Sequence, residues 1–253
     1  MSQQKSITRK VIEFLDDDDI TLWSAGLTFF TIFSTIPLMI ILLSLFTNMP
    51  IFHEMYSDFK NLVFEVLLPQ KSESVITYID QFVLSGADIG LQYYFYMFFI
   101  TVFFFKDYEH VVSRMFGKEN RGYLKIIGIY IALLIITPVA FILFFYMAEW
   151  MGMKFIAFLF AWALFFGLYF ISAIDVHKIS YIISSSLLTS SIWFTTKTLF
   201  VYYVSFNTTY TTLYGSFSTI FIALFWIYLS WMIFLYGLKL IKELEHHVSN
   251  QTL

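Results

Sequence analysis

Long stretches without Asp, Glu, Lys or Arg dominate the pattern of this chain. Two of them, from Asp19 to Glu54 and from Lys197 to Lys239, exceed the about 20 helical residues that cross a bilayer. Six apolar runs follow along the chain: Leu22–Phe46, Gly90–Phe105, Ile126–Met147, Phe155–Ile174, Ile179–Tyr203 and Leu213–Leu238. Backbone groups cannot stay unpaired in hydrocarbon, so each run predicts a helix. The expected fold class is therefore all-α, a polytopic membrane protein with six transmembrane helices.

The segment between the first two runs, residues 48–88, has apolar residues at helical spacing on both sides of Pro69. It predicts an outer insert of two amphipathic helices that lie on the membrane or cap the bundle. The expected organisation is an N-terminal segment 1–21, a six-span domain 22–240 that includes the insert, and a tail 241–253. Because the first 19 residues are polar, we expect the first run to remain as an anchor rather than to be removed as a signal peptide.

Basic residues predict the orientation, since they accumulate on the cytoplasmic side. With six spans, eleven of the 15 basic residues fall on the side of the two termini: Lys5, Arg9, Lys10, Lys106, Arg114, Lys118, Arg121, Lys125, Lys178, Lys239 and Lys242. The other side has Lys60, Lys71, Lys154 and Lys197. Both termini are therefore predicted to be cytoplasmic, in a multi-pass protein of a bacterial inner membrane.

The amino-acid composition excludes several kinds of site and partner. The chain is 59% hydrophobic and 13% charged, has a net charge of −3, and contains no Cys. These values exclude a disulfide framework and Cys-ligated metal, and they argue against a nucleic-acid partner. No catalytic, phosphate-binding or metal-ligand motif is found. We therefore expect no enzyme, no metal and no cofactor, with membrane lipids as partners and an envelope protein as a second candidate partner.

Small and hydroxyl residues form stripes within three spans, and prolines interrupt the first and third at Pro37 and Pro138. Such stripes either let helices pack closely or line a hydrated groove, and the sequence leaves both readings open. The candidate groove residues are Ser24, Thr28, Thr31, Thr35 and Pro37 in span one, Ser184, Ser191, Thr195 and Lys197 in span five, and Gly215 and Thr219 in span six.

Lys197 is the most informative charge, because it follows 18 uncharged residues and precedes the apolar run Leu199–Val204. Either it snorkels to the outer headgroups, or it faces a cavity and holds a phosphate or carboxylate. Asp88 and Glu149 are expected at the same outer level and are candidate partners for its ammonium group.

An ordered set of segments, Ala25–Phe30, Ser34–Leu38, Val66–Pro69, Tyr214–Gly215, Trp226–Tyr228 and Leu235–Gly237, resembles the YihY/BrkB family of bacterial inner-membrane proteins. The resemblance covers essentially the whole chain and implies six transmembrane helices. Members have carried the labels virulence factor and ribonuclease BN, and the second fits this sequence badly for lack of an acidic metal cluster. Here Leu238–Lys239 stands where members usually have Ala-Glu.

Two functions remain as expectations. The first is transport or flipping of an amphiphilic, anionic, lipid-like envelope molecule, based on the stripes, the prolines and Lys197. The alternative is a non-catalytic partner or scaffold in envelope assembly or virulence, acting through the outer insert 48–88.

Overall fold

The computed structural model describes residues 13–48, 91–117, 153–173, 178–206 and 217–249, together with positions 77, 81, 122, 127–129, 136, 140, 143, 147 and 176. Its long elements are five α-helices: α2 (Asp18–Asn48), α5 (Leu91–Phe116), α7 (Met153–Ser172), α8 (Ile179–Phe206) and α10 (Phe217–Ser249). The described part has no strand, which confirms the all-α class.

The five helices coincide with the first, second, fourth, fifth and sixth expected spans. Most of the expected third span and of the insert 48–88 lies outside the described residues, so the six-span count and the insert stay predictions. Helix α2 continues through Pro37 without a break in its helical assignment, and the kink expected there also stays a prediction.

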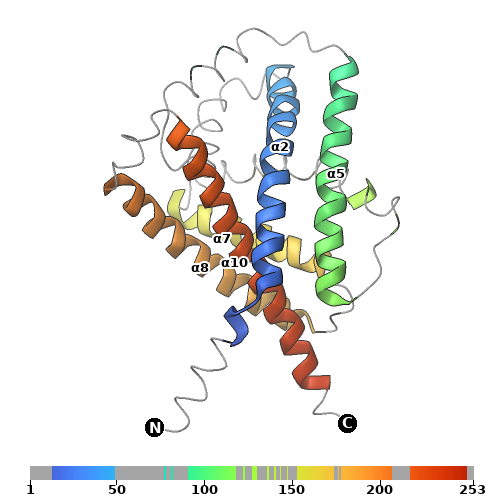
Figure 1. Cartoon of the computed structure of the whole chain (residues 1–253), viewed down its shortest axis with the longest axis vertical. Coiled ribbons are helices and arrows are strands. Elements are labelled where there is room, and N and C mark those ends of the chain that lie inside the picture. The colour runs from blue at the N-terminus through green and yellow to red at the C-terminus, as the bar shows by residue number, and fades with distance from the viewer. Residues whose placement is uncertain are drawn as a thin grey trace.

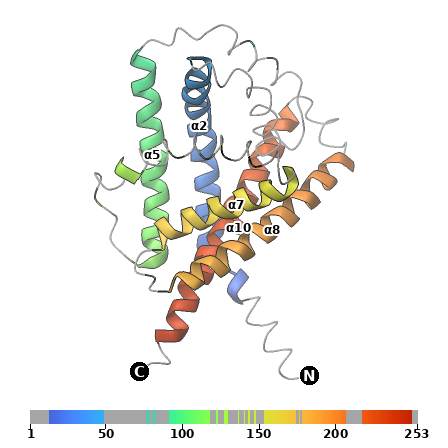
Figure 2. The same cartoon turned by 180° about the vertical axis from the view of Figure 1, so that it is seen from behind.

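Helix α10 is central to the arrangement, because it packs against α2 on one side and α8 on the other (Figure 1). Helix α5 runs antiparallel beside α2, and α7 packs along α8, as the reverse view also shows (Figure 2). Two pairs, α2 with α5 and α7 with α8, are thereby joined through α10.

The main hydrophobic core lies toward the end of the molecule where α2 begins and α10 ends (Figure 1). Its buried members include Ile20, Leu27, Val112, Tyr169, Ile182, Leu235, Leu238 and Ile241, which come from all five helices. A smaller cluster of Phe200, Ile222 and Trp226 continues the seam between α8 and α10 toward the other end. The helices are thus held by one shared core rather than by separate pairs.

The outer surface of the bundle is strongly apolar. Large hydrophobic side chains are exposed on every described helix, including Leu22, Phe103, Phe170, Leu199 and Phe225. Two described stretches are long and apolar enough to cross a membrane, Phe155–Ser172 in α7 and Ile220–His246 in α10. An apolar exterior of this kind is stable in contact with lipid, whereas a large exposed apolar surface is unusual for a soluble monomer.

Helix α5 continues well beyond Phe105, where the sequence predicts the second span to end. Lys106, His110 and Arg114 repeat every four residues and are exposed, while Tyr108 and Val112 are buried on other faces of the same turns. The continued apolar periodicity keeps these last turns in the core, so the charges project from a packed helix and not from a loop.

Candidate functional site

Helix α8 carries hydroxyl groups on two different faces. The inward face presents Ser185, Ser186, Thr189 and Ser190, all of them buried. Ser185 Oγ donates a 2.7 Å hydrogen bond to the carbonyl of Gly237 on α10, and Trp162 Nε1 of α7 donates to Ser186 Oγ at 3.1 Å. These side chains connect α8 to both of its neighbours, which is how hydroxyls stabilise contacts between membrane helices.

Tyr169 of α7 reaches across the same junction. Its hydroxyl donates to the carbonyl of Phe234 on α10 at 2.9 Å and lies 2.9 Å from Thr189 Oγ1 on α8. The tyrosine is fully buried, so its polar tip needs these partners. One side chain therefore joins three helices at a single point.

Gly237 makes this junction possible. A Cβ at position 237 would come closer than 3.0 Å to Oη and Cζ of Tyr169 and to Oγ1 of Thr189. The absence of a side chain thus lets α10 approach close enough for Ser185 to reach its backbone. We call Tyr169, Ser185, Thr189, Phe234 and Gly237 the three-helix junction.

The predicted groove residues of span five lie on the outer face of α8. Ser184, Ser191 and Thr195 are exposed, and each hydroxyl bonds to a carbonyl of its own helix, at 3.2, 2.9 and 2.8 Å. Thr198 is exposed and bonded in the same way. We call these four residues the outer hydroxyl stripe. Its polar atoms are satisfied without a neighbouring helix, as a lipid-facing position requires.

Lys197 is half-buried beside this stripe. Its ammonium nitrogen lies 5.9 Å from the centre of the Trp193 ring, within the range of a cation–π contact. The indole nitrogen of Trp193 in turn donates to Ser230 of α10 at 3.0 Å, which fixes the ring. The cation is therefore held against a rigid aromatic surface and remains partly accessible.

Among the predicted groove residues of span one, Thr31 contacts α10 and not the outer face of α8. Ser24 and Thr28 are buried, and Thr31 Oγ1 accepts a 2.8 Å hydrogen bond from Trp231 Nε1. The structure therefore does not bring the hydroxyls of α2 together with those of the outer hydroxyl stripe. The side chains of Thr35, Pro37 and Thr219, and the residues Gly215, Asp88 and Glu149, lie outside the described part.

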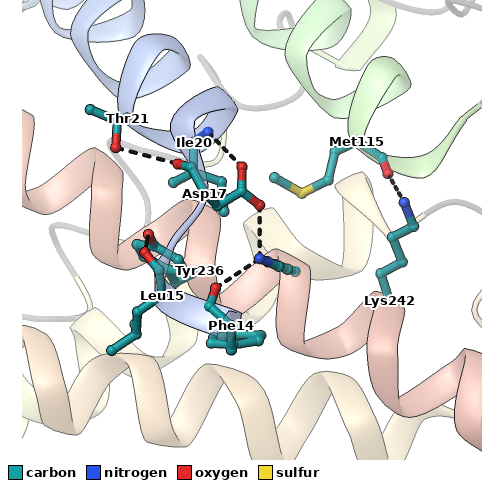
Figure 3. Close-up of polar contacts among 9 residues, drawn as sticks. Phe14, Leu15, Asp17, Ile20, Thr21, Met115, Tyr236 and Lys242 are labelled. Atoms are coloured by element: carbon teal, nitrogen blue, oxygen red, sulfur yellow. Dashed lines mark hydrogen bonds and ion pairs between the residues drawn. The ribbon is translucent and has the colours of Figure 1, made fainter. Parts of the chain in front are cut away.

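The N-terminal end of α2 is fastened to α10 by a set of polar contacts (Figure 3). Asp17 caps α2 by accepting from the amide of Ile20 at 3.2 Å, and it pairs with Lys239 at 2.7 Å. Lys239 also donates to the carbonyl of Phe14 at 2.7 Å, and the Tyr236 hydroxyl donates to that of Leu15 at 2.6 Å. We call these contacts the end clasp.

The charge of Asp17 follows from this geometry. Partial burial acts to raise its pKa, but hydrogen bonds from Lys239 and from the backbone, together with the Lys239 charge, outweigh burial and leave the pKa below its ordinary value of 3.8. A similar contact lies nearby, where Lys242 Nζ donates to the carbonyl of Met115 in the last turn of α5 at 2.6 Å (Figure 3). A cation is favourable at a helix C-terminus.

Sequence reasoning missed Tyr169, Ser113 and the pairing of Lys239 with Asp17. It placed Glu109 among the charges that close the second span, most of them interpreted as solvated at the interface, whereas the structure buries this side chain. Tyr169 sits in an aromatic-rich run where no pattern distinguishes a buried tyrosine from a lipid-facing one. Glu109 had a signal, since it is an acid in a stretch that keeps apolar helical periodicity after Phe105. Among the described residues, no group of three or more His, Cys, Asp or Glu is placed to hold a metal ion.

Comparison with known proteins places this bundle in a family. The profile of the virulence factor BrkB family matches residues 11–252. The chain is 25% identical over 238 residues to a UPF0761 membrane protein of Haemophilus influenzae, covering 88% of each chain. It is 24% identical to one of Mannheimia succiniciproducens, covering 87% of this chain and 83% of the relative. A UPF0761 membrane protein of Pseudomonas paraeruginosa is 27% identical, and the match covers 88% of this chain and 58% of the relative.

No solved structure matches the fold of this chain. The family match extends over nearly all of its residues, and the relatives are named membrane proteins, in agreement with the apolar exterior of the helices. The chain therefore belongs to the virulence factor BrkB family and is a membrane protein.

Proposed function

We propose that this protein moves an amphiphilic, anionic, lipid-like envelope molecule between the leaflets of the bacterial inner membrane, with both of its own termini in the cytoplasm. The observation that supports the proposal is the outer hydroxyl stripe of α8 with Lys197 beside it. From Ser184 to Thr198 the stripe extends over about 21 Å at 1.5 Å per residue. That length is a large part of the about 30 Å hydrocarbon core.

The stripe suits a headgroup that passes along a helix while its tails remain in the bilayer. Each hydroxyl bonds to its own backbone when nothing else is near, so the empty stripe has no unpaired polar atom. A hydroxyl can rotate toward another acceptor, and its oxygen can also accept. Lys197 adds an ammonium group, which attracts a phosphate or carboxylate. No covalent step is required, and the proposal includes no catalysis.

The test is translocation in vesicles that contain the purified protein and a fluorescent phosphatidylglycerol or phosphatidylcholine. We expect the protein to accelerate exchange of the anionic lipid between leaflets, and Lys197→Gln to reduce that acceleration. Lys197→Arg retains the charge and should retain most of the rate. Lys178→Gln is the matched control, since Lys178 is exposed and lies 5.6 Å from the ring centre of Tyr181 at the start of α8.

A parent protein that exchanges phosphatidylglycerol no faster than protein-free vesicles would overturn the proposal. Equal loss of rate in Lys197→Gln and Lys178→Gln would overturn the role of Lys197, because both variants remove a cation near an aromatic ring of α8. The same vesicles with phosphatidylcholine report whether the effect depends on the charge of the headgroup.

One observation favours the alternative, a non-catalytic scaffold in envelope assembly. The hydroxyls of the outer stripe are already satisfied within α8, which is also what an inert lipid-facing helix needs. A scaffold predicts no lipid exchange in vesicles and a stoichiometric envelope protein that copurifies with the chain. Measurements of lipid exchange and of copurifying protein on one preparation therefore distinguish lipid movement from a scaffold role.

A further inference from the structure

The outward face of α5 changes from aromatic to basic at one level along the helix. Six exposed side chains lie on it at intervals of four residues, first three aromatic and then three basic: Phe95, Phe99, Phe103, Lys106, His110 and Arg114. At 3.6 residues per turn, all six fall within an arc of about 100°. We call the three basic residues the cationic row. One face of α5 therefore passes from apolar to cationic within a single turn, between Phe103 and Lys106.

Packing on the opposite side of α5 holds the cationic row in place. Four residues of the same turns are buried in the main core: Tyr108, Val111, Val112 and Met115. The helix ends only after Arg114, at Gly117, which has a φ of 66° and donates its amide to the Arg114 carbonyl at 3.1 Å. The row therefore projects outward from a packed helix, so its spacing is fixed before any ligand arrives.

The charge of the cationic row is not explained by contacts within the protein. No ion pair joins the row to a carboxylate in the part of the chain that the structure describes. Asp107 beside the row offsets one positive charge and leaves the balance positive. The helix dipole acts within the last turn, where Lys242 Nζ already donates to the Met115 carbonyl at 2.6 Å. Lys106 lies before that turn and needs another reason to be there.

We propose that this face of α5 binds an acidic phospholipid of the surrounding leaflet. The headgroup phosphate lies on the cationic row, and the acyl chains lie along Phe95, Phe99 and Phe103. Lysine and arginine both donate charge-assisted hydrogen bonds to phosphate, and arginine can do so with two parallel bonds. A free anion would use the row alone. The apolar surface that adjoins it on the same face fits an amphiphile that stays in the membrane.

The level of the row identifies the leaflet. Helix α5 ends where α2 begins and α10 ends (Figure 1), which is the side that the basic residues predict to be cytoplasmic. If hydrocarbon ends at Phe103, the headgroup layer covers about the next 6 Å. The row extends over about 12 Å at 1.5 Å per residue. Lys106 and His110 then lie among the headgroups, and the long Arg114 side chain reaches back toward them.

This site is separate from the outer hydroxyl stripe, because α5 packs against α2, whereas α8 packs against α7 and α10. It requires binding in one leaflet and no movement across the membrane. The experiment uses the absence of Cys from the chain. Ile100→Cys, exposed beside the three phenylalanines, carries a fluorophore that brominated acyl chains quench on contact. Leu164→Cys, exposed in an uncharged part of α7, carries the same fluorophore as the control position.

Both labelled proteins are placed in phosphatidylcholine vesicles with a small, equal fraction of brominated phosphatidylglycerol or brominated phosphatidylcholine. We expect phosphatidylglycerol to quench the label at position 100 several-fold more than phosphatidylcholine, because each Lys or Arg near the surface attracts acidic lipid. At position 164 the two lipids should quench equally. The readout is occupancy at equilibrium, so its outcome does not depend on whether the protein moves lipid between leaflets.

Lys106→Gln combined with Arg114→Gln should lower the ratio of the two quenching values at position 100 to about one, since the electrostatic attraction is lost. Lys178→Gln is the matched control, because it removes an exposed cation outside the row and should leave the ratio unchanged. Equal quenching by the two lipids in the parent, or a parent-like ratio in the double variant, would overturn the site. Loss of the preference on addition of glycerol phosphate at constant ionic strength would also overturn it, because the occupant would then be a free anion.

Discussion

The two faces of α8 carry the same residue types, but within the described residues it is the hydroxyls of the inner face that bond to other helices, while Ser190 on that face bonds within α8. On the inner face, Ser185 and Thr189 bond to atoms of α10 and α7, and the helices approach closely at Gly237. On the outer face, the hydroxyls of Ser191 and Thr195 bond to carbonyls of α8 itself and to no other helix that the structure describes. Hydroxyl content alone therefore does not reveal a packing face, and the partner of each hydroxyl decides its energetic role.

The largest effect is expected at Gly237. Gly237→Ala places a Cβ closer than 3.0 Å to Tyr169 and Thr189, so the three-helix junction must open. We expect a loss of about 3 kcal/mol of unfolding free energy, at the upper end of the usual cost of overpacking. This loss is measured by unfolding the protein in detergent micelles with increasing amounts of a denaturing detergent.

Gly167 of α7 is the matched control for this change, since no atom lies within 4 Å of a Cβ built there. Gly167→Ala should leave stability unchanged or raise it slightly, because alanine is the better helix former. Equal losses of unfolding free energy for Gly237→Ala and Gly167→Ala would contradict the close packing of helices at Gly237.

A smaller effect is expected at Tyr169. Tyr169→Phe keeps the ring but removes the hydroxyl that contacts the Phe234 carbonyl and Thr189. We expect a loss of about 1.5 kcal/mol, the cost of leaving a buried polar group without its partner. The exposed Tyr202 provides the contrast, because Tyr202→Phe should leave the same unfolding curve unchanged.

At the end clasp, Asp17→Ala should lower the free energy of unfolding by about 1 kcal/mol, the usual contribution of an N-cap side chain. Asp17 also predicts a pH dependence, because its folded pKa lies below 3.8. Stability from ionised Asp17 is complete above pH 3.8 and is lost as the pH falls through the lower folded pKa. Unfolding of the parent between pH 6 and the most acidic tolerated pH gives the profile.

Asp17→Asn separates the two contributions of this residue, since asparagine is a good N-cap but carries no charge. Its stability should fall less steeply in acid than that of the parent. If the two profiles are parallel at low pH, the pairing of Asp17 with Lys239 does not stabilise the folded protein.

The smallest effect is expected on the outer face of α8. Ser191→Ala removes a hydroxyl that is exposed and bonded to the Leu187 carbonyl, so stability should change by less than about 0.5 kcal/mol. Ser185→Ala, measured beside it, should cost about 1 kcal/mol because Gly237 loses a partner from another helix. Comparable losses of unfolding free energy for Ser191→Ala and Ser185→Ala would contradict the difference between the two faces of α8.

The sequence predicts the helical class and the position of five helices, because long apolar runs without charges have few structural solutions. It also predicts the family, which the profile match over residues 11–252 confirms. The stripe of Ser184, Ser191 and Thr195 is correctly predicted to share one face, since helical spacing fixes that relation.

Which face of a helix meets another helix could not be predicted. In a soluble protein the polar face of a helix is turned toward water. In lipid, both faces of α8 can carry apolar residues, and a hydroxyl on either face can bond to a carbonyl of its own helix. The partner of Ser185 depends on Gly237, 52 residues away in the chain. Contacts of that kind follow from tertiary packing and leave no local periodic signal.

The central place of α10 has a consequence for biosynthesis. It is the last of the described helices to leave the ribosome, yet it supplies partners to Thr31 of α2, Ser185 of α8 and Phe14 at the start of the described chain. Until α10 is inserted, these groups lack the contacts that α10 supplies. Assembly of the described bundle therefore requires α10, because it is the helix that joins the α2–α5 pair to the α7–α8 pair.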